Sequence, residues 1–232
     1  MRVPARPNPS IASAEPRDAI ALAVSVATTE HFTLQTARST TVAEANSRAS
    51  GYLATLSSTL IALAFIGNMS GLSTAFYLFS TLLLPVLAFV GIVTFGRLVQ
   101  CTTEDIAYAR RIAKLREFYV DVIPDLERYL TIVRGDATSE LPEKGHDQPS
   151  NRQLFLTIAG MIAVVNSVVI GTACGLVASI VTSNSLVPSL AVGAPVALMS
   201  LVAHVAHQQQ VLRRGKGQVV DEFAVVVPSA TH

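Results

Sequence analysis

Three arginines in this sequence are candidates for contact with a phosphate group: Arg48, Arg110 and Arg111. A planar guanidinium presents paired N–H donors that match the oxygens of a phosphate group. Each arginine also has a simpler interpretation. Arg48 can anchor a helix at a membrane boundary by extending its charged end toward the headgroups, and Arg110 and Arg111 can be exposed charges. We treat all three as candidate ligand-binding residues beside that alternative.

The other polar residues that could do chemistry do not form a catalytic or metal site. His204 and His207 lie three residues apart, a spacing that can bind a metal, but no Cys, Asp or Glu within the apolar segments completes a ligand set. Asn166 is the only amide in the middle of an apolar segment, where it is expected to hold helices together. No nucleophile elbow or phosphate-binding glycine loop is present. We therefore predict no catalytic residue, no metal and no cofactor, and a protein that is not an enzyme.

Two long stretches contain no Asp, Glu, Lys or Arg: residues 49–96 and 153–212. A helix needs about 20 apolar residues to cross a bilayer core, and helices satisfy their own backbone hydrogen bonds there. Each stretch is long enough for two spans, which predicts an all-α membrane protein with four transmembrane helices as two hairpins. The predicted spans are 51–67, 74–96, 154–182 and 186–206, with turns at 68–73 and 183–185 and with Pro85 and Pro195 inside the second and fourth spans.

The distribution of Lys and Arg predicts the orientation of these spans. The two turns within the hairpins contain no basic residue, whereas the N-terminal segment has five, residues 97–152 have nine and the C-terminal segment has three. Because cytoplasmic loops are enriched in Lys and Arg, we predict that the N-terminus, the central loop and the C-terminus are cytoplasmic. Arginine dominates the basic residues, and Ala and Val are frequent, which favours the cell membrane of a bacterium. The net charge of +1 gives no reason to expect nucleic acid as a partner.

Outside the hairpins the sequence predicts a cytoplasmic helical extension. Thr102 or Thr103 can cap a helix that begins there, and apolar residues then recur at heptad spacing from Tyr108 to Val133. Pro124 should break this helix, and the apolar run 219–227 has a strand-like composition. The predicted divisions are a disordered N-terminus (1–16), a cytoplasmic helix (17–50), the first transmembrane hairpin (51–97), the heptad-patterned helix (102–134), a linker (135–153), the second transmembrane hairpin (154–207) and a cytoplasmic tail (208–232).

Small residues recur every fourth position in the third span, which is a pattern typical of close helix packing. The central residues of this ridge are Ala163, Ser167, Gly171, Gly175 and Ser179, and the first span has a shorter version in Ser50, Ala54, Ser58 and Ala62. Our interpretation is packing of the four helices within one chain; packing between protomers stays open as the alternative, because the motif type supports either.

Residues 45–53, Ala-Asn-Ser-Arg-Ala-Ser-Gly-Tyr-Leu, stand where the cytoplasmic helix enters the first span. This run resembles the corresponding stretch of the small transmembrane effectors of bacterial cyclic-pyrimidine anti-phage systems (Pycsar) and of related two-span effectors in nucleotide-signalling defence. In that family a long helix leads through an Ala-Asp-x-Lys-Ala-like stretch into a two-helix hairpin, and residues 17–133 are similar to that unit. Asn46 stands where the family tends to have Asp and Arg48 where it has Lys, and the second hairpin is additional.

The resemblance implies that a cyclic nucleotide made on infection triggers assembly of the chain into a homo-oligomer that compromises the bilayer. Two alternatives from other classes remain open. One is a non-enzymatic membrane scaffold that oligomerises through the cytoplasmic heptad stripe and recruits a partner. The other is a passive channel, because association of several chains can line a pore with Ser, Thr and backbone groups.

Overall fold

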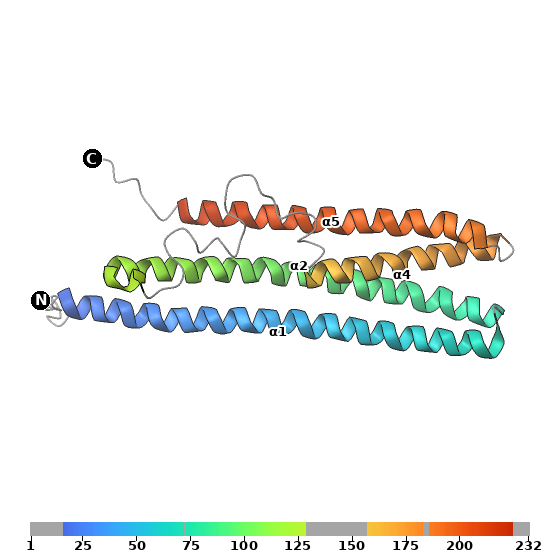
Figure 1. Ribbon diagram of the computed structural model, residues 1–232, viewed down its shortest axis with the longest axis horizontal. Helices are drawn as coiled ribbons and strands as arrows, with labels where there is room; N and C mark the ends of the chain where they lie inside the picture. Colours follow the sequence, from blue (N-terminus) through green and yellow to red (C-terminus); the bar gives the residue numbers. More distant parts are fainter. Residues whose placement is uncertain (1–15, 72, 129–156, 183–185, 225–232) are drawn as a thin grey trace, which may run out of the picture. The chain divides into compact units, whose positions relative to one another are not determined.

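The computed structural model describes residues 16–71, 73–128, 157–182 and 186–224, and within these ranges the chain is all-helical (Figure 1). The first two helices are separated only by a short turn, and Gly71 in that turn has a φ of 62°, in the region that glycine adopts readily. The elements are the α-helix α1 (Pro16–Ser70), the α-helix α2 (Thr74–Val122), the 3₁₀-helix η1 (Pro124–Arg128), the α-helix α4 (Ile158–Val181) and the α-helix α5 (Leu186–Ala224).

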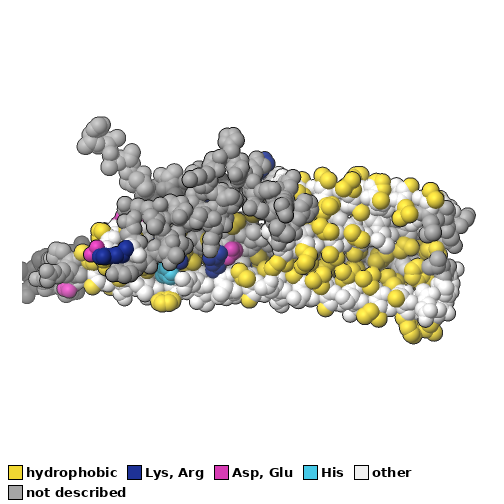
Figure 2. Space-filling model, in the orientation of Figure 1, with side chains coloured by type: hydrophobic (Ala, Val, Ile, Leu, Met, Phe, Trp, Pro, Cys, Tyr) yellow, Lys and Arg dark blue, Asp and Glu magenta, His cyan; other side chains and the backbone are white. Residues whose placement is uncertain are grey.

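All four α-helices are long and apolar enough to cross a membrane. Figure 2 shows hydrophobic side chains gathered on the visible face where α1 and α2 approach their connecting turn. Large apolar side chains point outward from these helices, among them Leu78 and Leu198. Exposed leucines at this density are unfavourable in water and favourable in lipid. The four helices thus support the prediction of a multi-pass membrane protein.

The chain divides into two compact units. The described part of the first unit consists of the beginning of α1, to residue 39, and the end of α2 from residue 108, together with η1. Its buried positions on α1 include Ala27 and Leu34, seven residues apart, and on α2 Ile112. The ring of His31 contacts the ring of Tyr119, with centroids 6.0 Å apart. The centre of the predicted heptad stripe is therefore used for packing within the chain.

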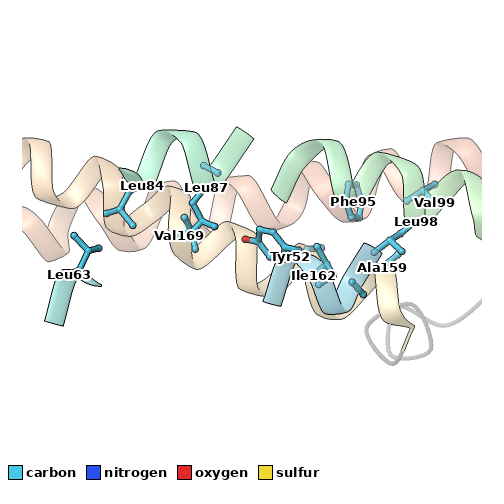
Figure 3. Close-up of a cluster of buried hydrophobic side chains, with 13 residues drawn as sticks. Tyr52, Leu63, Leu84, Leu87, Phe95, Leu98, Val99, Ala159, Ile162 and Val169 are labelled. Carbon is cyan, nitrogen blue, oxygen red and sulfur yellow. The ribbon is translucent and has the colours of Figure 1, made fainter. Parts of the chain in front are cut away.

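The second unit holds the apolar segments of all four α-helices, and its core is drawn in Figure 3. Tyr52 of α1, Leu87 of α2 and Ile162 of α4 are among its most deeply buried side chains. The helices α4 and α5 pack directly on one another. They run antiparallel, because Gly171 lies against Gly193 and Ala197 whereas Gly175, one turn later, lies against the earlier residue Ser189.

The prediction that a new helix begins at Thr102 or Thr103 is wrong. The helix α2 continues through both residues, and their hydroxyls donate to the carbonyl oxygens of Leu98 and Val99, each at 3.0 Å. A threonine within a helix satisfies its hydroxyl in this way as readily as it caps one. No proline or glycine occurs between residues 97 and 122, so nothing interrupts α2 before Pro124. It ends at Val122 and is followed by η1.

Two further boundaries differ from the sequence-based expectation. The run 219–227 is helical in its described part, because α5 continues to Ala224. Each residue added to an existing helix forms one more internal hydrogen bond, and no strand occurs among the described residues for this run to pair with. Residues 68–70 belong to α1 rather than to the turn. The predicted linker 135–153 lies outside the described residues, as does the predicted disordered N-terminus (1–16) except for Pro16, which is the first residue of α1.

Candidate functional site

Four charged side chains of the second unit form one connected group, which we call the junction cluster: Glu44, Arg48, Arg97 and Glu104. Arg97 donates to both carboxylate oxygens of Glu44, from Nε to Oε1 and from Nη2 to Oε2, each at 3.0 Å. Arg48 donates from Nε to the same Oε1 at 2.8 Å. Arg97 also donates from Nη1 to Glu104 Oε1 at 3.2 Å. The cluster joins α1 to α2 through a two-pronged contact, which is the strongest geometry for such a pair.

The sequence positions of the two arginines explain why they meet. Arg48 is the last charged residue before the stretch 49–96, and Arg97 is the first one after it. When the intervening residues form two helices that return on one another, the ends of the stretch come to the same side. Glu44 lies one helical turn before Arg48, so the two side chains meet on one face of α1, and the return of the chain brings Arg97 to the same carboxylate. All four side chains remain between 31% and 49% exposed, and are open to exchange with another charged group.

The junction cluster shifts the pKa values of its members in opposite directions. Hydrogen bonds from Arg97, and then from Arg48, lower the pKa of Glu44 from its ordinary value of 4.5 to about 2. The hydrogen bond to Glu44 and the charge of Glu104 raise the pKa of Arg97 above its ordinary value. Both groups are therefore charged throughout the physiological range, and the cluster of two cations and two anions is electrically neutral.

We expect Glu44→Gln to lower the melting temperature of the detergent-solubilised protein at pH 7. A carboxyl with a lowered pKa stabilises the folded chain above its ordinary value near 4.5, and this contribution is lost as the pH falls toward the folded pKa. The difference in melting temperature between wild type and variant should therefore shrink below pH 4.5. Glu30→Gln, at an exposed position of α1, is the control and should leave the melting temperature unchanged. A difference between wild type and Glu44→Gln that is the same at pH 7 and at pH 3 would contradict the assignment.

The three arginines proposed as ligand contacts fall in different parts of the structure. Arg48 is held by Glu44 through its Nε in the junction cluster, and its side chain is 49% exposed, so an anion that binds at Nε competes with that carboxylate. Arg110 and Arg111 belong to the first unit, on α2, where Arg110 is half-buried and Arg111 is exposed. Arg97, which sequence analysis did not single out, is the cation that the structure places beside Arg48.

A second polar contact lies in the core of the second unit and joins three helices. The side chain of Asn166 on α4 is fully buried and reaches the backbone of α2, where its nitrogen donates to the Ala88 carbonyl and its oxygen accepts from the Ile92 N–H, each at 3.3 Å. Tyr52 Oη of α1 accepts from the same nitrogen at 3.1 Å. In the opposite amide orientation only Tyr52 remains a partner, donating at 3.1 Å, so we assign the first. Asn166 thus links helices, as expected for a mid-span amide.

Gly91 makes the approach of Asn166 to α2 possible. A Cβ atom at this position would lie 2.4 Å from Cγ of Asn166 and 2.9 Å from Oη of Tyr52. Such distances are too short for any side chain. The polar part of the contact between the first two spans and the third therefore depends on one glycine, one amide and one hydroxyl, within a hydrophobic cluster that the same three helices share.

The two histidines of α5 pack on an aromatic ring. Phe95 of α2 lies edge-on to His204 with ring centroids 4.6 Å apart, and 6.2 Å from His207. His204 Nδ1 is 2.7 Å from the Ser200 carbonyl, which can only accept, so this nitrogen carries the proton. Among the described residues no group of three metal-binding side chains occurs. One turn further along α5, Gln208 donates to the hydroxyl of Thr157, the N-cap of α4, at 3.3 Å.

The predicted small-residue ridge of the third span is buried, and its central part faces α5. A Cβ atom at Gly171 would lie 2.5 Å from the Gly193 carbonyl oxygen, and one at Gly175 would lie 2.8 Å from the Ser189 carbonyl oxygen. The Ser189 hydroxyl donates to the Gly175 carbonyl at 2.9 Å. These contacts are within one chain. The buried members of the ridge are Ala159, Ala163, Ser167, Gly171, Gly175 and Ser179.

The corresponding ridge of the first span has the opposite environment. Ser50, Ala54, Ser58 and Ala62 are all exposed in the single chain. Ser57 is exposed beside them and donates to the Leu53 carbonyl of its own helix at 2.9 Å. The face of α1 that points away from the core therefore carries small and hydroxyl side chains next to the exposed apolar side chains of Leu60, Ile61 and Phe65.

No protein-family model, curated protein or solved structure matches this chain.

Proposed function

We propose that this chain is a non-enzymatic effector of the bacterial cell membrane, which a cyclic nucleotide activates from the cytoplasm to impair the bilayer in anti-phage defence. The observation that supports this proposal best is the junction cluster. It holds two arginines side by side, next to the apolar segments, and keeps them neutralised by carboxylates of the same chain. A nucleotide phosphate is a chemical competitor for those arginines, because guanidinium groups form the same paired hydrogen bonds with phosphate as with carboxylate.

Competition at the junction cluster provides a simple route from ligand to response. Glu44 on α1 and Arg97 on α2 are the charged link between these helices at the edge of their apolar segments. A phosphate that takes Arg97 and Arg48 releases the Glu44 carboxylate and loosens this link. A ligand can shift an equilibrium only by its difference in affinity for the two states, and an occupied junction cluster supplies such a difference.

In this proposal the four spans form two hairpins, with both termini and the central loop in the cytoplasm. The asymmetric distribution of Lys and Arg supports this orientation. The junction cluster then lies at the cytoplasmic boundary, where a soluble nucleotide can reach it.

The outward face of α1 supports assembly into a homo-oligomer. Hydroxyl and other polar side chains in membrane helices usually face a helix bundle or a water-filled cavity. In the single chain Ser50, Ser57 and Ser58 face neither. A neighbouring copy would cover this face, and its small residues would allow the backbones to approach closely.

The experiment is a thermal-shift screen of the purified protein with cyclic mononucleotides and cyclic oligonucleotides, followed by dye release from proteoliposomes. A ligand at a hundred times its dissociation constant should add about 2.7 kcal/mol to the stability of the folded state. Arg97→Gln should weaken binding at least tenfold, whereas Glu44→Gln should strengthen it because the competing carboxylate is gone. Arg128→Gln, which removes a more exposed arginine paired with Asp125, is the control for general electrostatics.

Three outcomes would overturn the proposal. The first is the absence of any shift in a folded sample, and the second is a shift that Arg97→Gln leaves unchanged. The third is dye release only when the nucleotide is on the side opposite to the N-terminus. Binding without release would favour the scaffold.

A passive channel is the second candidate function, and the outward hydroxyl face of α1 favours it. If several copies assemble with these faces around a common axis, Ser50, Ser57 and Ser58 line a polar path. A channel of this kind should leak dye or ions without any nucleotide, and Ser57→Leu should reduce that basal flux. An effector should have no basal flux.

A further inference from the structure

A groove of about 580 Å³ opens on the second unit between α2, α4 and α5. Its volume lies within the range of about 300–1,000 Å³ that is typical of small-molecule sites. All of its lining residues belong to the two charge-free stretches of the sequence. They include Thr81 and Pro85 of α2 and Ala173, Cys174, Ala178 and Thr182 along α4 and its C-cap.

The groove results from close packing on one side and small side chains on the other. Glycines at positions 171, 175 and 193 draw α4 and α5 together, and α4 presents Ala173, Cys174 and Ala178 toward the groove. These side chains are too short to fill the space next to α2. Pro85 has no N–H and cannot donate to the Thr81 carbonyl four residues earlier, and both residues line the wall.

The length and surroundings of the groove fit one hydrocarbon chain. Along α4 it extends from Ala173 to Thr182, which at 1.5 Å per residue is about 14 Å. This is close to one leaflet of a hydrocarbon core about 30 Å thick. Exposed apolar side chains continue from its edges, with Leu82 65%, Val181 79% and Val187 76% exposed, so the groove is continuous with the lipid-facing surface.

We propose that this groove binds one acyl chain of a membrane lipid, in the leaflet that holds the C-terminal end of α4. The occupant comes from the bilayer because a ligand from water would have to leave its hydration shell for a lining without a charged side chain. The bound chain fills space between the first pair of spans and the second. The polar contact between these two pairs, made by Asn166 and Tyr52, lies outside the groove. The site does not depend on the nucleotide proposal.

The experiment compares lipid retention in native mass spectra of protein released from nanodiscs of a single phosphatidylcholine. Wild type should retain one lipid molecule through mild activation. Ala178→Phe, which fills the groove, should lose it, whereas Ala203→Phe, at an exposed position of α5 outside the groove, should retain it. Equal retention in all three proteins would overturn the proposal. So would a protein dimer that Ala178→Phe dissociates, because the occupant would then be a second copy.

The thiol of Cys174 provides a second measurement that needs no substitution in the groove. In detergent, added phosphatidylcholine should slow alkylation of Cys174 by N-ethylmaleimide severalfold, as measured on the peptide that contains it. Cys101, which is buried away from the groove, is the internal reference. An alkylation rate at Cys174 that does not respond to lipid would overturn the proposal even if Ala178→Phe fails to fold.

Discussion

Gly91→Ala is expected to lower the melting temperature of the protein sharply, whereas Gly96→Ala on the same helix is not. The added methyl at Gly91 would lie 2.4 Å from Cγ of Asn166, and at Gly96 it would meet no atom within 4 Å. Overpacking of a core costs about 1–3 kcal/mol, and an amide pushed away from its partners costs a further amount of about 1–3 kcal/mol. At Gly96 alanine should gain about 0.5–1 kcal/mol from its greater helix propensity. Thermal unfolding in detergent measures both changes.

The effect of Gly91→Ala should depend on Asn166. In the background of Asn166→Ala, the atoms that would collide with the new methyl are gone except for the Tyr52 hydroxyl, 2.9 Å away. The double variant should therefore lose less stability than the sum of the two single variants, which a double-mutant cycle detects. Additive losses would show that the contact between Gly91 and Asn166 is not the one described above.

Gly171→Ala is the second substitution with a large expected effect. Its Cβ atom would lie 2.5 Å from the Gly193 carbonyl oxygen and 2.6 Å from Cβ of Ala197, so α4 and α5 would have to separate. We expect a loss of about 1–3 kcal/mol of stability. Gly51→Ala is the matched control, because a Cβ atom at Gly51 meets nothing within 4 Å.

The oligomeric state tests the packing of the ridge within one chain. If its central glycines pack within one chain, Gly171→Ala lowers the melting temperature and leaves the molecular mass of the detergent complex unchanged. Gly193→Ala should behave in the same way, because its Cβ atom would lie 2.8 Å from the Gly171 carbonyl oxygen. A variant with unchanged stability and an altered mass would place the ridge between protomers.

Local signals in the sequence predicted helix type and membrane character well and predicted helix boundaries less well. The lack of charge in residues 49–96 and 153–212 is a property of composition, and it holds whatever the neighbours are. The caps expected at Thr102 and Thr103 were wrong because a threonine hydroxyl serves the interior of a helix equally well. The strand-like composition of 219–227 did not stop α5, which continues through the described part of this run to Ala224.

For the functional candidates too, the sequence predicted individual residues better than it predicted which residues lie together. Arg48 was visible in the sequence because it borders a charge-free stretch, but its partners Glu44 and Arg97 were not identified as one cluster. A signal was available, since Arg48 and Arg97 flank the same stretch and a return of the chain must bring them together. No sequence pattern predicted the groove at Pro85. Its lining comes from three helices, and the groove exists only because short side chains of these helices lie at the same level of the bundle.

The sequence by itself determined that the chain is helical, that it has four segments able to cross a membrane, and which segments carry charge. These properties follow from the free energy of placing each side chain and each peptide group in water or in lipid, which depends on local composition. The tertiary structure alone decided that Asn166 enters α2 at Gly91, that the third-span glycines face α5 and that the first-span serines face outward. Small residues permit close approach on every face where they occur, and only the packing of particular helices selects the faces that are used.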